Sequence, residues 1–304
     1  MHPRAKLPMG IRCRPMISCA GEAGLGALVV MQTRQSGLYR RGVLAAMAAG
    51  VLARRAAAQA PAVQDPWPPL ASQIFDGRTV EDGGAILAID APYRAEDAAL
   101  VPIGLHILLA PDDTRQIRRI TLVVDGNPSP LAAVFSPGPA SGIRSLATRV
   151  RVDSYTNIHA VAELSDNRLY AVARFVKAAG GCSAPAAKLE ADAVPPDSMR
   201  FRQFPPLAND ASGRREAELL IRHPNYTGMQ MDQLTRLYVP AYFVRTVRFW
   251  QGDDVLLSIE GGISISENPA FRFDYRPNGA GSFRAEVEDS KGGTARQEWP
   301  VAPA

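Results

Sequence analysis

The stretch IRRITLVVDGNPSPLAAVF, residues 117–135, sets the expected fold class. It begins with Ile117–Val124, an apolar and β-branched run of strand length. The residues that follow, Gly126-Asn127-Pro128-Ser129-Pro130, favour a turn, and Ala132–Phe135 is a second short apolar run. This pattern predicts two short strands that are joined by a turn.

Runs of the same kind continue on both sides, separated by turn residues at spacings of about ten residues and without a helical period. The other strands expected in the first region are Ile86–Ile89, Pro102–Leu109, Ile143–Val152, Ile158–Leu164 and Arg168–Val176. Those expected in the second region are Ala217–Arg222, Ala241–Phe249, Val255–Ile259, Ala270–Tyr275, Ser282–Val287 and Gln297–Val301. We therefore predict an all-β protein with two β-sandwich domains.

The gaps between these runs predict the domain bounds. Residues 61–176 form the first sandwich, and their Pro-rich start, residues 61–71, is expected to be extended. Residues 177–198 contain a Gly/Ala-rich stretch without strand or helix pattern, so we interpret them as the linker to the second sandwich, residues 199–304. The 25 glycines and 25 prolines among 304 residues fit a chain rich in turns.

The first 60 residues are an N-terminal extension of a different character. Arg40-Arg41 precedes a short Ala-rich apolar core, Ala45–Ala53, and small residues follow it. This order is typical of a twin-arginine export signal, and cleavage after Ala58 is favoured because Pro61 would hinder cleavage closer to it. Nine core residues are too few to span a bilayer. We expect a periplasmic protein; a basic N-terminal tail is the alternative.

Removal of this extension changes the charge and the cysteine content. Nine of the 34 Lys and Arg residues, but one of the 30 Asp and Glu residues, fall in 1–60, so the net charge of +4 becomes −4. An acidic remainder has little means of neutralising phosphates, which argues against nucleic-acid binding. Cys13 and Cys19 also lie in the extension, which leaves Cys182 as the single cysteine of the exported chain. It therefore has no partner for an internal disulfide.

Cys182 follows Gly180-Gly181 and precedes Ser183 in the linker. Glycines and alanines make this segment slim and mobile, as a thiol needs in order to enter a partner's pocket. We expect an exposed thiol with a pKa of about 8.5, activated by a partner rather than by the chain itself. The sequence alone leaves open an incidental cysteine, a catalytic nucleophile, a metal ligand or an intermolecular disulfide.

The sequence resembles the SoxY and SoxZ subunits of the sulfur-carrier complex, fused in one chain. The first-domain residues that carry this resemblance are Val101-Pro102-Ile103, Asn127-Pro128-Ser129-Pro130, Arg168-Leu169-Tyr170, Val176-Lys177 and Gly180-Gly181-Cys182. The second-domain residues are His223-Pro224, Thr227-Gly228, Val239–Val244, Ser266-Glu267-Asn268-Pro269 and Phe271. The fused arrangement resembles the SoxYZ-like carriers that are associated with quinoprotein dehydrogenases.

This resemblance implies two immunoglobulin-like sandwiches and a protein that is not an enzyme. It implies that Cys182 holds a sulfur-containing, thiosulfate-oxidation-type intermediate covalently, on an arm formed by Gly180, Gly181 and Ser183. No resident cofactor is implied. The implied partners are periplasmic sulfur-oxidation enzymes, or a quinoprotein dehydrogenase with its cytochrome. The family's arm ends freely after Gly-Gly-Cys-Gly-Gly, whereas Cys182 is followed by Ser183-Ala184-Pro185 and another domain.

Other functions have weaker support. A thiol enzyme needs a base near Cys182, and His106, His159 and His223 are better explained as strand or turn residues. The histidines and the cysteine lack metal-ligand spacing, and we find neither a GxGxxG nor a Walker-type loop. The alternative to a covalent carrier is a non-covalent binding or assembly module that serves a periplasmic quinoprotein (alcohol or methanol) dehydrogenase. In that case the thiol is incidental.

Overall fold

The computed structural model describes residues 65–110, 112–185, 198–206 and 213–302. The predicted export signal in residues 1–60, and residues 186–197 of the predicted linker, lie outside these ranges. The one helix of the described part is α2, Trp67–Ile74. The strands of the first domain are β1 Val80–Asp82, β2 Leu87–Asp90, β3 Val101–Ile107, β4 Ile117–Val124, β5 Leu131–Pro137, β6 Ser145–Val150, β7 Thr156–Leu164 and β8 Leu169–Val176. Those of the second domain are β9 Met199–Pro206, β10 Arg215–Ile221, β11 Val244–Gln251, β12 Asp254–Gly261, β13 Ala270–Tyr275, β14 Ser282–Asp289 and β15 Thr294–Pro300.

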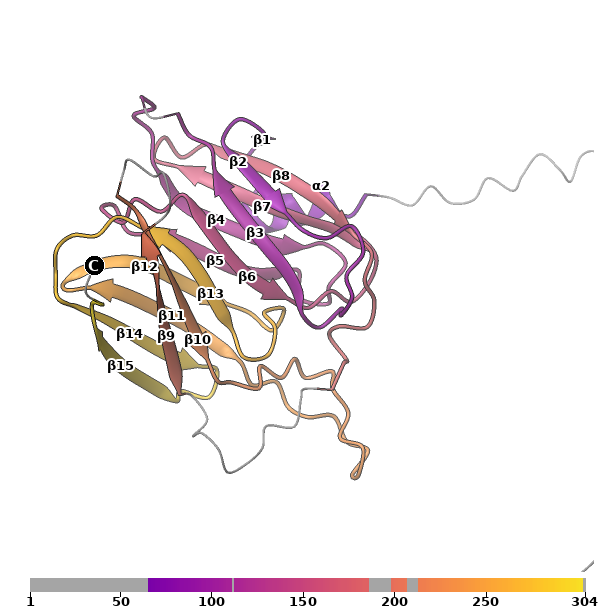
Figure 1. The fold of residues 1–304 in the computed structure, drawn as a ribbon. Coiled ribbons are helices and arrows are strands. Elements are labelled where there is room, and N and C mark those ends of the chain that lie inside the picture. The colour runs from indigo at the N-terminus through magenta and orange to yellow at the C-terminus, as the bar shows by residue number, and fades with distance from the viewer. Residues whose placement is uncertain (1–64, 111, 186–197, 207–212, 303–304) are drawn as a thin grey trace, which may run out of the picture. The chain divides into compact units, whose positions relative to one another are not determined.

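The expected all-β fold with two sandwich domains is confirmed, and the strands of both domains belong to the same two sheets. The larger sheet has the order β1-β8-β7-β4-β5-β12-β11-β14-β15, and the smaller has the order β2-β3-β6-β13-β10-β9. The domains meet where β12 pairs with β5 and β13 pairs with β6, in both cases antiparallel (Figure 1). Each domain thus covers an edge that the other would otherwise leave open.

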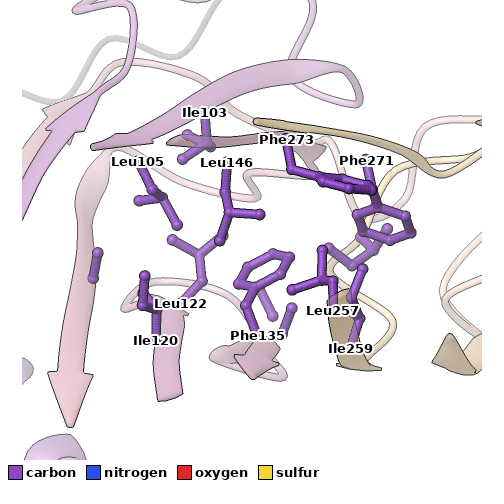
Figure 2. Packing of buried hydrophobic residues seen from close by; sticks show 14 of the residues in the cluster. Ile103, Leu105, Ile120, Leu122, Phe135, Leu146, Leu257, Ile259, Phe271 and Phe273 are labelled. Atoms are coloured by element: carbon purple, nitrogen blue, oxygen red, sulfur yellow. The ribbon is translucent and has the colours of Figure 1, made fainter. Parts of the chain in front are cut away.

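One hydrophobic core runs between the sheets and across this junction. Figure 2 shows side chains of the smaller sheet, including Leu105 and Phe273, pointing toward Leu122 and Ile259 of the larger one. In β3, every second residue is buried and the residues between them are exposed or partly buried, as expected for a strand with one face on a core. Because the core is shared, the position of the second domain is fixed against the first.

The start of the first domain differs from the expected extended segment. Prolines are tolerated in the first turn of a helix, where their missing N–H has no intrahelical acceptor, and the Asp65 carboxylate accepts the amide of Trp67 at 3.1 Å. The resulting helix α2 packs Ala71 and Phe75 against Val161 and Leu169 on the outer side of the larger sheet. This cover explains why β7 is buried along most of its length.

Candidate functional site

The site is built around the single cysteine in the described part of the chain. Cys182 lies six residues after the end of β8, in the segment 178–185, which we call the carrier segment. The side chain is buried, with 1% of the residue's surface exposed. The carrier segment therefore packs onto the first domain instead of projecting from it.

Backbone hydrogen bonds hold the carrier segment against the strand end that follows β6. The Gly180 amide donates to the carbonyl of Asp153 at 2.8 Å, and the Gly181 amide donates to the carbonyl of Val152 at 3.0 Å. The segment then turns, with the Ala184 amide donating to the Gly180 carbonyl at 3.0 Å. These contacts hold the residues on both sides of Cys182 against the first domain.

The two glycines serve this close packing. A Cβ on Gly181 would lie 2.0 Å from the Ala98 carbonyl oxygen and 2.7 Å from that of Val152, so no other residue fits there without movement. Gly180 has a φ of +78°, which disfavours other residues, although space around it is open. We expected the glycines to avoid steric contact with the walls of a partner's pocket. In the structure, Gly181 instead avoids steric contact with the backbone of its own chain.

The second domain contacts the carrier segment through Thr227. Its Oγ1 donates to the carbonyl oxygen of Cys182 at 2.6 Å, and the residue is 3% exposed. Gln230 orders this loop by accepting the Thr227 amide at 2.9 Å through Oε1. The loop therefore closes over the cysteine from the second domain.

Arg151 lies beneath the carrier segment and is completely buried. Its Nη1 donates to the Gly181 carbonyl at 3.1 Å, whereas Nε and Nη2 have no hydrogen-bond partner among the described residues. Burial lowers the pKa of this guanidinium, and the charges of Glu267, Cys182 and Asp97 oppose that effect. Arg151 directly follows β6, between Val150 and Val152, and strand alternation gave no reason to expect a buried charge there.

The environment of Cys182 disfavours the thiolate. Burial raises the pKa of the thiol to about 11, the charge of Asp153 adds to this rise, and the charge of Arg151 acts against it. The expectation of an exposed, mobile cysteine with a pKa of about 8.5 is therefore wrong for this structure. Of the residues assigned to the arm, Gly180 and Ser183 are exposed, whereas Gly181 and Cys182 are buried.

A buried polar network ties this site to the domain boundary. The Asn127 amide nitrogen donates to the Arg151 carbonyl at 2.8 Å and to Ser264 Oγ at 2.9 Å, and its Oδ1 accepts the Asp153 amide at 2.9 Å. Ser264 Oγ in turn donates to the Ser129 carbonyl at 2.7 Å. Asn127 thus connects both domains to the residues around Cys182, a role that its place in a predicted turn did not indicate.

A second network fixes the loop that carries Thr227. Asn268 Oδ1 accepts the His223 amide at 3.2 Å, and the Asn225 side-chain amide donates to the Ile265 carbonyl at 3.2 Å. His223 is fully buried, and its Nδ1 lies 2.9 Å from Asn225 Oδ1. Asn268-Pro269 therefore meets His223-Pro224, about 45 residues earlier in the sequence, and both lie next to the loop that carries Thr227-Gly228 on the second-domain side of the site.

The remaining histidines lie in other contacts. His106 Nε2 is 2.9 Å from an Asp90 oxygen on the surface, and His159 Nδ1 is 2.9 Å from Asp125 Oδ1. The charged groups that shift the pKa of the Cys182 thiol are Asp153 and Arg151. Within the described residues, no cluster of three or more His, Cys, Asp or Glu side chains could hold a metal ion.

Comparison with known proteins gives two family matches. Residues 71–182 match the family model of the sulfur oxidation protein SoxY, and residues 205–300 match that of the sulphur oxidation protein SoxZ. A search of curated proteins finds no match. The SoxY match ends on Cys182.

Solved structures that resemble parts of the chain were also found. The sulfur carrier protein SoxY from Chlorobium limicola f thiosulfatophilum has 24% identity and a TM-score of 0.31, with 36% of this chain and 89% of that chain covered. A superoxide reductase (neelaredoxin) from Ignicoccus hospitalis has 15% identity and a TM-score of 0.28, with 31% and 82% covered. The two consecutive family matches show that this chain belongs to the SoxYZ-like proteins, as a SoxY domain fused to a SoxZ domain.

Proposed function

We propose that this protein is an exported thiol carrier, in which Cys182 holds a sulfur-containing intermediate of thiosulfate oxidation covalently and presents it to partner enzymes. The observation that carries this proposal is the SoxY match, which ends on Cys182, the one cysteine outside residues 1–60. We further propose that the chain has no catalytic activity of its own. In support, the groups around the thiol raise its pKa instead of activating it.

Loading with thiosulfate requires a redox partner. When the sulfur of Cys182 bonds to the outer sulfur of thiosulfate, the thiol loses its proton and two electrons leave with an acceptor. The product is an S-thiosulfonate whose sulfonate end is an anion. We propose that a cytochrome, or a quinoprotein dehydrogenase system with its cytochrome, accepts the electrons, and that a sulfur-oxidation enzyme consumes the product.

Presentation requires the carrier segment to open. Among the described residues, four hydrogen bonds join it to the rest of the chain, from Gly180 to Asp153, from Gly181 to Val152, from Arg151 to Gly181 and from Thr227 to Cys182. At about 1 kcal/mol each, reduced by the chain entropy that opening recovers, local opening costs a few kcal/mol. Such a cost allows an open form without unfolding of either sandwich. The flexible glycines and Ser183 would absorb the movement.

We place this function in the periplasm, reached by the twin-arginine route. None of the helices in the described ranges has the length and apolar character to cross a membrane.

The direct test is the intact mass of the protein isolated from its host under non-reducing conditions. We expect a sulfur-containing adduct that reductant removes and that maps to Cys182. The Cys182→Ser chain is the control and should show no adduct while retaining its fold. Recovery of only the free thiol, together with full function of the Cys182→Ser strain, would overturn the proposal.

A further inference from the structure

Two nitrogens on one edge of the Arg151 guanidinium lack a hydrogen-bond acceptor. Nη1 is bonded to the Gly181 carbonyl, and Nε and Nη2 are buried with no partner among the described residues. In arginine, Nε and Nη2 direct two N–H bonds side by side from the same edge of the plane. This fork matches two oxygens of a carboxylate, phosphate or sulfonate.

The surrounding carboxylates leave this fork open. Asp97 and Glu267 are near enough for their charges to act on Arg151, but neither is a hydrogen-bond partner of its side chain. Asp97 Oδ1 instead accepts the Ala99 amide at 2.7 Å. A buried cation with two donor nitrogens that lack acceptors destabilises the folded chain. An anionic ligand beside Cys182 would supply both the acceptors and the opposite charge.

We propose that the Nε and Nη2 edge of Arg151 is an oxoanion subsite that binds the sulfonate end of the cargo on Cys182 while the carrier segment is closed. This inference rests on the proposed carrier function and names the class of cargo that the closed site retains. Two sulfonate oxygens accept the two free N–H groups, and Nη1 keeps its bond to Gly181. A neutral cargo lacks this attachment and leaves the segment freer to open.

Asp153 provides a second charge beside Cys182, whose effect on an anionic cargo should be opposite to that of Arg151. Its negative charge disfavours an anion at Cys182, whereas Arg151 favours one. The Asp153 main chain is bonded to Gly180 and Asn127, so Asp153→Asn removes the charge and retains those bonds. The two residues should therefore shift the retention of an anionic cargo in opposite directions.

The test uses two adducts that are prepared without any partner enzyme. The Cys182 thiolate attacks a central sulfur of tetrathionate, which gives the S-thiosulfonate and releases thiosulfate. The same thiolate attacks the sulfenyl sulfur of methyl methanethiosulfonate, which gives the neutral methyl disulfide and releases methanesulfinate. The rate at which dithiothreitol removes each adduct is measured on the full chain and on a synthetic peptide of residues 178–185. The ratio of peptide rate to protein rate is the protection of that adduct.

We expect protection of the anionic adduct to exceed that of the neutral adduct by about tenfold, which corresponds to ~1.4 kcal/mol. Arg151→Lys keeps the charge but not the fork and should remove most of the excess, and Arg151→Gln should remove all of it. Asp153→Asn should increase the excess. Arg149→Gln is the matched control, because Arg149 lies on β6 two residues away and bonds to the Asn268 carbonyl. It should leave the excess unchanged.

A second measurement covers the case in which the Arg151 variants do not fold. In the unaltered protein, the NMR signal of the Arg151 Nε–H should move on formation of the thiosulfonate and not on formation of the methyl disulfide. Equal protection of both adducts, with an unmoved Nε–H signal, would overturn the subsite. Absence of a native adduct on protein from the host would instead overturn the carrier function, and the behaviour of the chemically loaded chain would still decide the subsite.

Discussion

The hydroxyl of Thr227, in the SoxZ domain, donates a 2.6 Å hydrogen bond to the main-chain carbonyl of Cys182, at the end of the SoxY match. The bond acts on the backbone of the carrier segment and leaves the thiol itself unbonded to Thr227. The SoxZ domain is therefore part of the site, since it helps to hold the cysteine closed. Any partner that displaces the Thr227 loop would weaken this closure.

Removal of the Thr227 hydroxyl should expose the cysteine more often. Thr227→Val keeps the shape of the side chain and removes the hydroxyl that bonds to the Cys182 carbonyl, at a net cost of about 1 kcal/mol for that bond. It also removes the contacts of the same hydroxyl with Gln230 Oε1 and with the Met229 amide, which lie within the loop. The rate of Cys182 alkylation by iodoacetamide, followed by mass spectrometry, should rise about fivefold. Thr227→Ser keeps the hydroxyl and is the matched control. An unchanged rate in Thr227→Val would show that this bond does not hold the carrier segment.

The two glycines should differ in their effects on closure. Gly181→Ala places a methyl group 2.0 Å from the Ala98 carbonyl oxygen, so the carrier segment cannot take its present position and alkylation should accelerate more than about tenfold. Gly180→Ala meets no atom within 4 Å and introduces strain at a φ of +78°, with a cost of about 1 kcal/mol. Its alkylation should accelerate less.

Ser183→Ala is the control for both glycine variants, because Ser183 is exposed and its hydroxyl donates to the Gly180 carbonyl at 3.3 Å, within the carrier segment itself. Circular dichroism should show an intact fold in all three variants. If Gly180→Ala and Gly181→Ala react equally fast, close packing at Gly181 is not what limits access to Cys182.

The sequence was sufficient for the fold class, because strand periods and turn residues are local signals. Asn127, Thr227 and Asn268 were named as residues that carry the family resemblance, but the sequence did not predict that they meet around Cys182. Edge strands of the two sandwiches were expected to pair within the chain, but the sequence did not identify β5 and β6 as the strands of the first domain that do so. Such pairing depends on edges that become complementary only when both domains are folded.

The closed state of Cys182 was not predictable from the sequence. A run of glycine and alanine has the same local properties whether it is free or packed, and its packing here depends on carbonyl groups of Ala98 and Val152. The same holds for Arg151, whose position within a strand-like run indicated no buried charge. Both features are consequences of tertiary contacts.

The stability of the folded chain should fall as pH rises through the titration of Cys182. Burial raises the pKa of the thiol from an ordinary 9.0 to about 11. Between these values the unfolded chain has released the proton that the folded chain still binds, so stability is full below pH 9 and is lost toward pH 11. The maximum loss is about 2–3 kcal/mol.

Urea unfolding of the wild-type and Cys182→Ser chains across this pH range gives the measurement. Other groups titrate there in both chains, so the difference between their free energies of unfolding isolates the cysteine. We expect the advantage of the wild-type chain to shrink as pH rises. A difference that is independent of pH would show that the thiol titrates alike in both states.

Substitution at the domain junction should destabilise both domains together. Phe271 on β13 packs edge-on against Phe135 on β5, with ring centroids 6.3 Å apart, and both are buried. Because the two sheets and the core continue through this contact, Phe271→Ala should cost about 3–4 kcal/mol and leave one cooperative transition. Trp67 reports on the first domain and Trp250 on the second, so chains in which Trp299 and one of these two tryptophans are replaced by phenylalanine separate their signals. Both unfolding midpoints should shift equally in urea, whereas Phe175→Ala, on the outer part of β8 and 39% exposed, should shift neither appreciably.

A shift confined to the Trp250 signal would mean that the domains unfold independently. The SoxZ domain could then leave Cys182 without unfolding the sandwich that carries it.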